Sequence, residues 1–598
     1  MPSDQQVQDL VYQLEEGRWK KWITLGVFIS IAIMAFVGFV LDPWYWGFYR
    51  GLQHPKAMEA AEIAREVSRG NGFTTKMIRP LAIAQFRTNR GVIPGGTVPD
   101  TFQAPLWPLT VAPFYLALEK WPDSIIPFRV SHKDRWSVSP RDYIYAGDRI
   151  ISGVATLFLL LSIIVNYFTA RRLFDNHIAL WTVVFMFGCS LLWKWAQSGL
   201  PQMQMLFFFS AAMYTLVRVI EFHNDTQRWP FLWLLATTVF LGLLTLCHGI
   251  GLWVFLGTVV FCAVYISGWR KTLILMLGGY ALMMLPWLWH TYKTCGNPFG
   301  VAIFTLLEQV RGTENAIMRS GDYEFSGLSP TIFRQKLQSG IVTQFSNLFS
   351  SLGGILVAPV FFLGLLHNFK HPTPRGFRWG LLSIWIFSVI GMALFSLAEE
   401  DAGSGLSAND LNVLFIPLFS SFGMAFLLVL WMRLEISVAI LRYAFYVLVC
   451  VLCSFPMLNT LTMRTRAAVQ WPPYFPPGIG ILREWTQPSE IIVSDMPWAV
   501  AWYADRKSLW LPASIQEFLE INDYRKLGGH IAGIHLTPIS GNKGLISDIV
   551  KGDFKQWAPF VLRSVNIKDF PMRAVTALPI DQQCIFYSDH DRWTDRAE

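Results

Sequence analysis

The sequence has few charged residues. Asp, Glu, Lys and Arg make up 15% of its 598 residues, against about a quarter in a typical soluble domain. Hydrophobic residues account for 53% and aromatic residues for 15%, and many of them fall in long apolar runs. A run of about 18 or more apolar residues can cross a membrane as a helix. The composition therefore excludes an ordinary soluble protein and predicts a polytopic membrane protein.

Cysteine is also scarce, with seven residues in the chain. Most of them lie in or beside apolar runs, where cysteine behaves as a small hydrophobic residue. The C-x-x-C pair Cys450 and Cys453 falls inside such a run, and only Cys295 and Cys584 occur in long polar regions. We therefore expect neither a disulfide framework nor a zinc site. The net charge of +8 lies in short connectors between apolar runs, so we also expect no nucleic-acid partner.

Eleven candidate spans follow from the apolar runs. Their approximate limits are 22–41, 148–168, 178–196, 201–220, 229–247, 249–268, 272–290, 346–366, 379–397, 411–431 and 437–457. The first run lacks the short core and the cleavage site of a removable signal, so we expect it to be retained.

The charges of the connectors predict the orientation of these spans. Cytoplasmic connectors carry an excess of Lys and Arg. With the charged head 1–21 in the cytoplasm, the cytoplasmic connectors hold pairs such as Arg171 and Arg172, whereas an opposite connector, 399–401, is wholly acidic. An odd number of spans then places the C-terminal tail and the loops 42–147 and 291–345 on the outer face.

The chain changes character after about Trp471. A Pro-rich stretch, 471–478, is typical of a stiff linker. Three short apolar segments, 490–493, 508–511 and 530–536, are typical of strands, and 514–523 has a helical pattern with a Ser start. No Gly-rich nucleotide-binding motif is present. The predicted fold is thus mostly α. It comprises a cytoplasmic head (1–21), a membrane helical bundle (22–460) with a large first outer loop, and an extracytoplasmic α/β domain (471–598).

The first outer loop contains a predicted helix that begins at Pro55. Ala60, Ile63, Ala64 and Val67 form an apolar stripe, charged residues occupy the other face, and Gly70 or Gly72 supplies a stop. This pattern predicts an amphipathic helix at the membrane interface. Residues 72–80 follow as extended chain, and 101–108 lead into a short apolar helix.

Several short motifs occur in a characteristic order. They are Glu59, Ala64-Arg65, Gly70-Asn71-Gly72-Phe73, Ala104-Pro105-Leu106-Trp107-Pro108, Asp148-Arg149, Arg171-Arg172-Leu173-Phe174, Ser198-Gly199-Leu200-Pro201 and 494–503 in the tail. This order resembles the bacterial GT-C glycosyltransferases, which include the protein mannosyltransferases and the lipid A aminoarabinose transferase. The resemblance implies a multi-pass enzyme of the bacterial cytoplasmic membrane. Its donor would be a polyprenyl-phosphate sugar, and its acceptor a lipid, a glycan or a protein.

The sequence departs from this family at two places. Family members usually carry Asp where Glu59 stands, and an alignment anchored on residues 61–65 places that acid near Lys56 or Ala57. Many members have an Arg before the late Pro-containing span, where this chain has 409–417 without one.

An inverting sugar transfer assigns roles to particular residue types. A carboxylate acts as general base for the acceptor hydroxyl, and we expect Glu59 or, second, Asp42 to supply it. Cations or a metal ion stabilise the leaving phosphate. The expected substrate-binding residues are Lys76, Arg79, Arg149, His248, Asp410 and Asn412. No cofactor and no metal-ligand set are predicted, although the acidic run 399–401 leaves a divalent metal open.

Each assignment has a simpler alternative. Glu59 can be one charge on a solvated helix face, Asp42 the interfacial end of a span beside Trp44, and Arg149 a side chain that reaches the headgroups. The whole chain can instead be a polysaccharide polymerase or ligase, a transporter or a non-catalytic assembly subunit. The long first loop and the absence of charge pairs within the spans favour the transferase over the transporter.

Overall fold

The structure is a computed structural model. It describes residues 51–90, 98–119, 145–307, 317–321, 330–395, 405–434, 439–462, 476–523, 527, 529–540, 550–564, 570–579 and 583–593. These residues all belong to one unit, 51–598. The predicted head, the first span, Asp42, the acidic run 399–401 and most of the Pro-rich linker lie outside the described residues.

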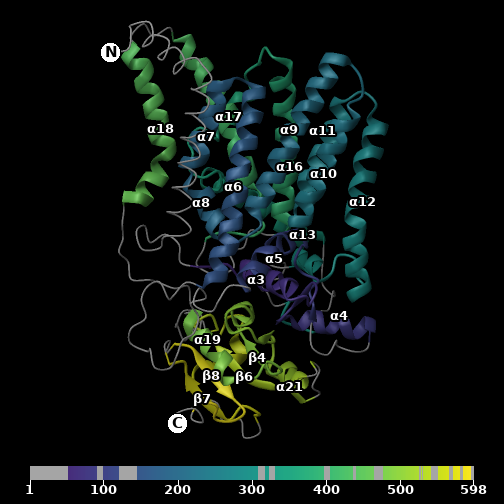
Figure 1. The fold of residues 1–598 in the computed structure, drawn as a ribbon, viewed down its shortest axis with the longest axis vertical. Helices are drawn as coiled ribbons and strands as arrows, with labels where there is room; N and C mark the ends of the chain where they lie inside the picture. The colour runs from purple at the N-terminus through teal and green to yellow at the C-terminus, as the bar shows by residue number, and fades with distance from the viewer. Residues whose placement is uncertain are drawn as a thin grey trace, which may run out of the picture. The chain divides into compact units, whose positions relative to one another are not determined.

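Long apolar helices make up most of the described chain. Five are long and apolar enough to cross a membrane, namely α6 (Ala146–Leu173), α9 (Gln202–Thr226), α12 (Trp269–Cys295), α16 (Pro372–Phe395) and α17 (Asn412–Arg433). A sixth candidate is the pair α7 (Asn176–Gly188) and α8 (Ser190–Gln197), which is bent by 56°. Three more apolar helices are α10 (Phe231–Cys247), α11 (Gly251–Tyr265) and α18 (Ala439–Thr462). Figure 1 shows helices α9, α10, α11 and α16 side by side. The protein is thus a multi-pass membrane protein, but these helices do not confirm the predicted count of eleven spans.

The predicted span 346–366 is not a continuous helix. It contains the end of α13 (Pro330–Ser346), then α14 (Leu348–Ser351) and α15 (Val360–Gly364). Gly353 and Gly354 separate the two short helices at φ of 78° and 64°, a conformation that ends a right-handed helix. Gly340 packs on Ala393 near the end of α16, and the Arg378 guanidinium near its start donates to the His367 carbonyl. The segment therefore runs along α16 in a broken path, so the regular helix expected from its apolar sequence is wrong.

The tail folds around a six-stranded sheet. Strands β4 (Ile491–Ser494), β5 (Lys507–Trp510) and β6 (Ile531–Leu536) are parallel, and β8 (Ile585–Ser588) and β7 (Ala574–Ala577) are antiparallel additions. The helical elements of the tail are α19 (Pro476–Trp485), α20 (Pro497–Ala499), the π-helix η6 (Val500–Ala504), α21 (Ile515–Asp523), η8 (Lys555–Trp557) and α23 (Ala558–Val561). The three predicted strands are confirmed within one residue. The predicted helix 514–523 is confirmed too, and Ser514 Oγ accepts from the Glu517 N–H at its start (3.1 Å).

The first loop supplies the remaining strand of this sheet. Strand β2 (Met77–Ile78) pairs with β5 in parallel, and the Ser508 N–H donates to the Lys76 carbonyl (2.8 Å). The order is β2-β5-β4-β6-β8-β7. Phe86, from α4 (Pro80–Arg90), is buried in the same apolar core as Val493 and Ile534. The sheet and its core thus join two segments more than 400 residues apart, which the sequence pattern did not predict.

The two long loops contain several further elements besides β2 and α4. They are α3 (Pro55–Ser68), the antiparallel pair β1 (Thr74–Thr75) and β3 (Val98–Pro99), α5 (Leu106–Glu119) and the 3₁₀ helix η5 (Val301–Leu307). The predicted helix at Pro55, the extended 72–80 and the short apolar helix after 101–108 are all confirmed. The Val301 N–H donates to the Thr101 carbonyl (3.2 Å), so the second long loop contacts the first.

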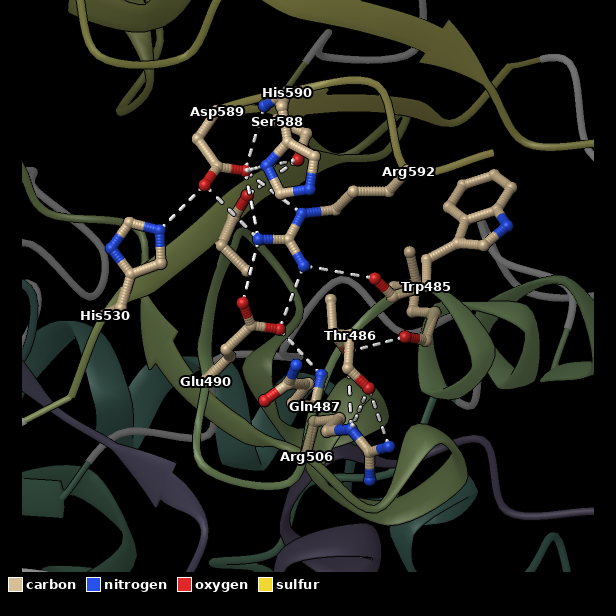
Figure 2. Close-up of polar contacts among 12 residues, drawn as sticks. Trp485, Thr486, Gln487, Glu490, Arg506, His530, Ser588, Asp589, His590 and Arg592 are labelled. Atoms are coloured by element: carbon tan, nitrogen blue, oxygen red, sulfur yellow. Dashed lines mark hydrogen bonds and ion pairs between the residues drawn. The ribbon is translucent and has the colours of Figure 1, made fainter. Parts of the chain in front are cut away.

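Arg592 ties the last described residues of the tail to α19 and β4. Figure 2 shows its guanidinium between Glu490 and Asp589. It donates to both Glu490 oxygens (2.8 and 2.9 Å) and to the Asp589 carboxylate, which also contacts His530 Nε2 at 2.8 Å. Burial raises the pKa of Asp589, but the hydrogen bonds from Arg592 and His530 outweigh it and hold that pKa below its usual value. This cluster therefore holds the last described residues of the tail against the segment that enters β4.

Candidate active site

Helix α3 carries the predicted general base. His54 caps its start, since His54 Nδ1 accepts from the Lys56 N–H (3.2 Å), and Gly70 follows its end at φ 81°. The prediction that the charged face of α3 lies exposed at the membrane interface is wrong. Glu59, Glu62 and Glu66 are only 4%, 0% and 2% exposed. The reason is that α3 packs against α5 on one side and against α20 and η6 of the tail on another.

Glu59 lies in a group of buried polar side chains that we call the Glu59 cluster: Glu59, Arg79, Asp100 and Gln103. Glu59 Oε2 accepts from Arg79 Nη2 (2.6 Å) and from Gln103 Nε2 (3.0 Å). Both of these donors contact Oε2, so the structure holds this carboxylate oxygen in place.

Arg79 lies between β2 and α4, and it is 5% exposed. Its guanidinium stacks on Phe102, with Cζ 3.9 Å from the ring centroid. Arg79 Nε is buried and has no acceptor within the described part of the chain. A buried donor without an acceptor costs free energy, so this N–H is suited to a ligand that brings its own acceptor. Of the predicted phosphate-binding residues, Arg79 is the one that the structure places directly against Glu59.

Asp100 and Gln103 were not among the predicted site residues. Asp100 Oδ2 accepts from the backbone N–H groups of Phe102 (3.1 Å) and Gln103 (2.7 Å), which fixes the turn that presents Gln103 to Glu59. Burial raises the pKa of Asp100 to about 6, although Arg79 and the two N–H groups oppose the rise. An Asp side chain that accepts from the N–H groups two and three residues later is a common turn pattern that a sequence can indicate. The pattern does not indicate that this turn lies beside Glu59.

His248, in the connector between α10 and α11, lies within electrostatic reach of Lys56. Burial, with a smaller contribution from Lys56, lowers the pKa of His248 to about 3. The imidazole is therefore neutral near pH 7 and can only give or accept a hydrogen bond. Lys56 Nζ lies 5.7 Å from the Phe102 ring centroid. The anchored alignment places the family acid near Lys56 or Ala57.

The structure places the other predicted residues elsewhere. Lys76 forms ion pairs with Glu66 (3.1 Å) and Asp505, in a group that we call the Lys76 network: Arg65, Glu66, Arg69, Lys76 and Asp505. Asp410 Oδ1 accepts from the Asn412 N–H (2.8 Å), and Trp385 Nε1 donates to Asn412 Oδ1 (3.3 Å). Burial raises the pKa of Asp410 to about 6.

Arg149 is half-buried at the start of α6, and its Nε has no acceptor among the described residues. Within the described residues, no side-chain contact joins Lys76, Arg149, Asp410 or Asn412 to Glu59. Their predicted substrate-binding roles stay predictions.

The short motifs from distant parts of the sequence converge around α3. Trp107 Nε1 donates to the Gly199 carbonyl (2.9 Å). Gly199 adopts φ 75°, and a Cβ at this position would lie 2.5 Å from Leu52. Only glycine fits both the conformation and the close approach. Within the described residues, no group of three or more His, Cys, Asp or Glu side chains is arranged to hold a metal, so we assign no step of the chemistry to one.

Comparisons with known proteins give the class of this fold. No protein-family model matches the sequence, and no curated protein matches it either. Solved structures do match. Archaeal oligosaccharyltransferase AglB from Archaeoglobus fulgidus, in complex with an inhibitory peptide and a dolichol-phosphate, has a TM-score of 0.52 at 13% identity and covers 90% of this chain and 72% of its own. The A. fulgidus oligosaccharyltransferase in complex with Zn and sulfate has a TM-score of 0.53 at 12% identity, with 94% and 73% covered.

ArnT from Cupriavidus metallidurans, bound to undecaprenyl phosphate, has a TM-score of 0.43 at 12% identity and covers 95% of this chain and 98% of its own. The similarity to the oligosaccharyltransferase shows that this chain shares the fold of that protein. This fold agrees with the resemblance that the first-loop motifs indicated.

Proposed function

We propose that this protein is a glycosyltransferase of the bacterial cytoplasmic membrane. It transfers a sugar from a polyprenyl-phosphate donor to an acceptor hydroxyl at the outer face. The observation that carries the proposal is the Glu59 cluster. A buried carboxylate, held through Oε2, lies against a buried guanidinium whose Nε has no acceptor among the described residues. That pair supplies the two functions that the reaction needs, on a fold that membrane glycosyltransferases share.

The reaction can be written with these groups. The acceptor oxygen attacks the anomeric carbon, and a new C–O bond forms with inversion. Glu59 Oε1 takes the acceptor proton as general base. The bond between the anomeric carbon and the phosphate oxygen breaks, and its electron pair leaves with the prenyl phosphate. Gln103 and Arg79 hold Glu59 Oε2, which orients Oε1 toward the acceptor.

Arg79 and Lys56 are the cations that oppose the charge developing on the leaving phosphate. Arg79 is buried, and an electrostatic interaction is stronger in such surroundings than in water. The guanidinium contacts Glu59 through Nη2 and keeps Nε for the phosphate. His248, neutral and close to Lys56, adds a hydrogen bond to a sugar or phosphate oxygen.

A lipid-linked donor is supported by two observations. The sequence has no nucleotide-binding motif, and the solved AglB structure is described in complex with a dolichol-phosphate. The tail and the first loop contact each other, so both lie on the same face of the membrane. We place that face outside, opposite the cytoplasmic nucleotide-sugar pool, on the charge asymmetry of the connectors. The acceptor is a lipid, a glycan or a protein.

Mass spectrometry of the cell envelope tests the proposal. Envelope lipids, surface glycans and glycoproteins are compared between cells that contain the protein, cells that lack it and cells complemented with the gene. We expect one glycosylated species to disappear without the protein, to return on complementation and to give the mass of the sugar. Identical profiles in all three, under conditions where the protein is made, would contradict the glycosyltransferase proposal.

A further inference from the structure

One tail residue, Trp502, lies where three membrane-proximal elements meet. It belongs to the π-helix η6 and is 1% exposed. Its ring centroid is 5.6 Å from that of Tyr115 on α5 and 5.1 Å from that of Tyr145 before α6. A Cβ on Gly147 would lie 2.7 Å from the indole. A π-helix is rare and often marks a functional position.

Trp502 forms a hydrogen bond to the first carboxylate of α6. Trp502 Nε1 donates to Asp148 Oδ1 at 2.7 Å, and the neighbouring Tyr503 hydroxyl donates to Asp148 Oδ2 at 3.0 Å. The Leu52 N–H of the first loop donates to the same Oδ2 at 3.3 Å. A buried carboxylate needs such donors to stay buried. Through these hydrogen bonds, Asp148 holds the start of α6 against both the tail and the segment that precedes α3.

Arg65 fastens α3 to the same tail segment. Arg65 Nη1 donates to the Trp502 carbonyl and Nη2 to the Ala501 carbonyl, both at 2.8 Å. Its guanidinium also lies 4.6 Å from the centroid of the Trp502 ring. A cation at the carboxyl end of a helix stabilises the exposed carbonyl groups there. Arg65 is fewer than two turns along α3 from Glu59, so the tail fixes the helix that carries the general base.

We infer that Trp502 is a positioning residue of the transferase. It acts through Asp148 and Arg65 to hold α3 in register with the starts of α5 and α6, and this register places Glu59 against the bound substrates. The inference rests on the proposed function. Because Trp502 acts on geometry and touches neither substrate, its loss lowers kcat more than it raises the KM for the donor. A displacement of about 1 Å in a catalytic group is enough for a large loss of rate.

Trp502→Phe tests this inference, and Trp510→Phe is its matched control. Both changes remove an indole N–H from a buried Trp of the tail. Trp510 Nε1 has no acceptor in the described part of the chain, whereas Trp502 Nε1 binds Asp148. Full-length protein in detergent or nanodiscs is used, with the polyprenyl-phosphate sugar that the envelope analysis identifies. We expect Trp502→Phe to lower kcat about tenfold, with the KM for the donor within about twofold, and Trp510→Phe to change neither.

Amide hydrogen exchange of peptides from α3 gives a second readout that does not need activity. We expect faster exchange in Trp502→Phe than in the wild type or in Trp510→Phe. Unchanged exchange in Trp502→Phe would overturn the inference, and so would faster exchange with unchanged kcat. A wild-type protein that transfers no sugar would refute the proposed function, and the exchange data would still decide whether Trp502 holds α3. Asp148→Asn, combined with Trp502→Phe, should give a loss smaller than the product of the two single losses.

Discussion

Helix α3 contributes residues to two charged clusters, the Glu59 cluster and the Lys76 network. Both contain carboxylates and cations, but we assign them different roles. In the Lys76 network, Glu66 accepts from Arg69, Lys76 and Asn71, and Asp505 accepts from Arg65, Arg69 and Lys76. Each of these two carboxylates has three donors, and all three donors to Asp505 contact Oδ1. In the Glu59 cluster, Glu59 Oε2 has two donors, and the buried Arg79 Nε has no acceptor among the described residues.

This difference indicates a structural role for the Lys76 network and a chemical role for the Glu59 cluster. The charges of the Lys76 network pair with one another and join the first loop to the tail. The Glu59 cluster keeps a buried donor without an acceptor, which is typical of a site prepared for a ligand. Burial alone does not make the distinction, since Glu62 and Glu59 are both buried on the same helix. The predictions below test the contrast between the two clusters.

The largest expected effect comes from the base itself. Glu59→Gln removes the proton acceptor and keeps the shape of the side chain, so we expect kcat for sugar transfer to fall by about 100-fold or more. The measurement is transfer from a polyprenyl-phosphate sugar by purified protein. Glu62→Gln is the control one turn away, and we expect it to stay within a few-fold of wild type. Full activity in Glu59→Gln would move the assignment to Asp42. If Asp42→Asn is also fully active, the carboxylate-base mechanism is wrong.

The second test compares the two cations. Arg79→Gln removes a partner of Glu59 and the proposed phosphate donor, and a charge-assisted hydrogen bond contributes about 1.5–3 kcal/mol. We therefore expect kcat/KM to fall by about 30-fold. Lys76→Gln disturbs only the Lys76 network and should lower kcat/KM by less than about threefold. Steady-state kinetics at saturating acceptor provide the measurement. A larger loss in Lys76→Gln than in Arg79→Gln would reverse the roles that we assign to the two clusters.

The Lys76 network predicts a loss of stability rather than of chemistry. Asp505 has φ 53°, which Asn tolerates better than most residues, so Asp505→Asn removes the charge with little backbone strain. The ion pairs of Asp505 are only partly buried. Removing its charge therefore costs between about 1 kcal/mol, the value for an exposed pair, and about 3 kcal/mol, the value for a buried one. We expect faster amide exchange in β2 and η6, where the loop meets the tail. Asp523→Asn, at an exposed position of α21, should change little. Equal exchange in the two variants would contradict the assigned role of the network.

The smallest effect is a pH dependence of stability from Glu62. Burial raises the pKa of Glu62 to about 8, although Arg65 opposes the rise. The folded protein thus keeps a proton that the unfolded chain releases near pH 4.5, the ordinary value. The stability contribution of Glu62 is therefore fully present below about pH 4.5 and declines until about pH 8. Between about pH 6 and about pH 8.5, wild type should lose more thermal stability than Glu62→Gln. Equal slopes for the two proteins would refute this protonation state.

The sequence predicted the local elements well because their signals are local. Pro55, the apolar stripe and Gly70 define α3, and short apolar segments define β4, β5 and β6. It failed where a neighbour far along the chain decides the outcome. The pattern of α3 indicated a solvated charged face, yet the tail covers that face. Likewise, the apolar run 346–366 indicated a regular span, but Gly353 and Gly354 break it.

The candidate site was predicted only in part for the same reason. Glu59 and Arg79 were named, and the structure joins them. Lys76 was named for its charge, but Asp505, more than 400 residues away, engages it. Asp100, Gln103 and Lys56 were not predicted as site residues, because nothing near them in the sequence shows that they lie close to Glu59.

The sequence by itself determined that this is a multi-pass membrane protein with a polar first loop and a small α/β tail, because hydropathy and strand periodicity depend on neighbouring residues. Only the tertiary structure decided which charges pair with one another and which buried donor, Arg79 Nε, has no acceptor among the described residues. That distinction depends on contacts such as Arg79 with Glu59, Lys76 with Asp505 and Trp502 with Asp148. Each of these contacts forms because the folded chain buries polar groups that must then find partners.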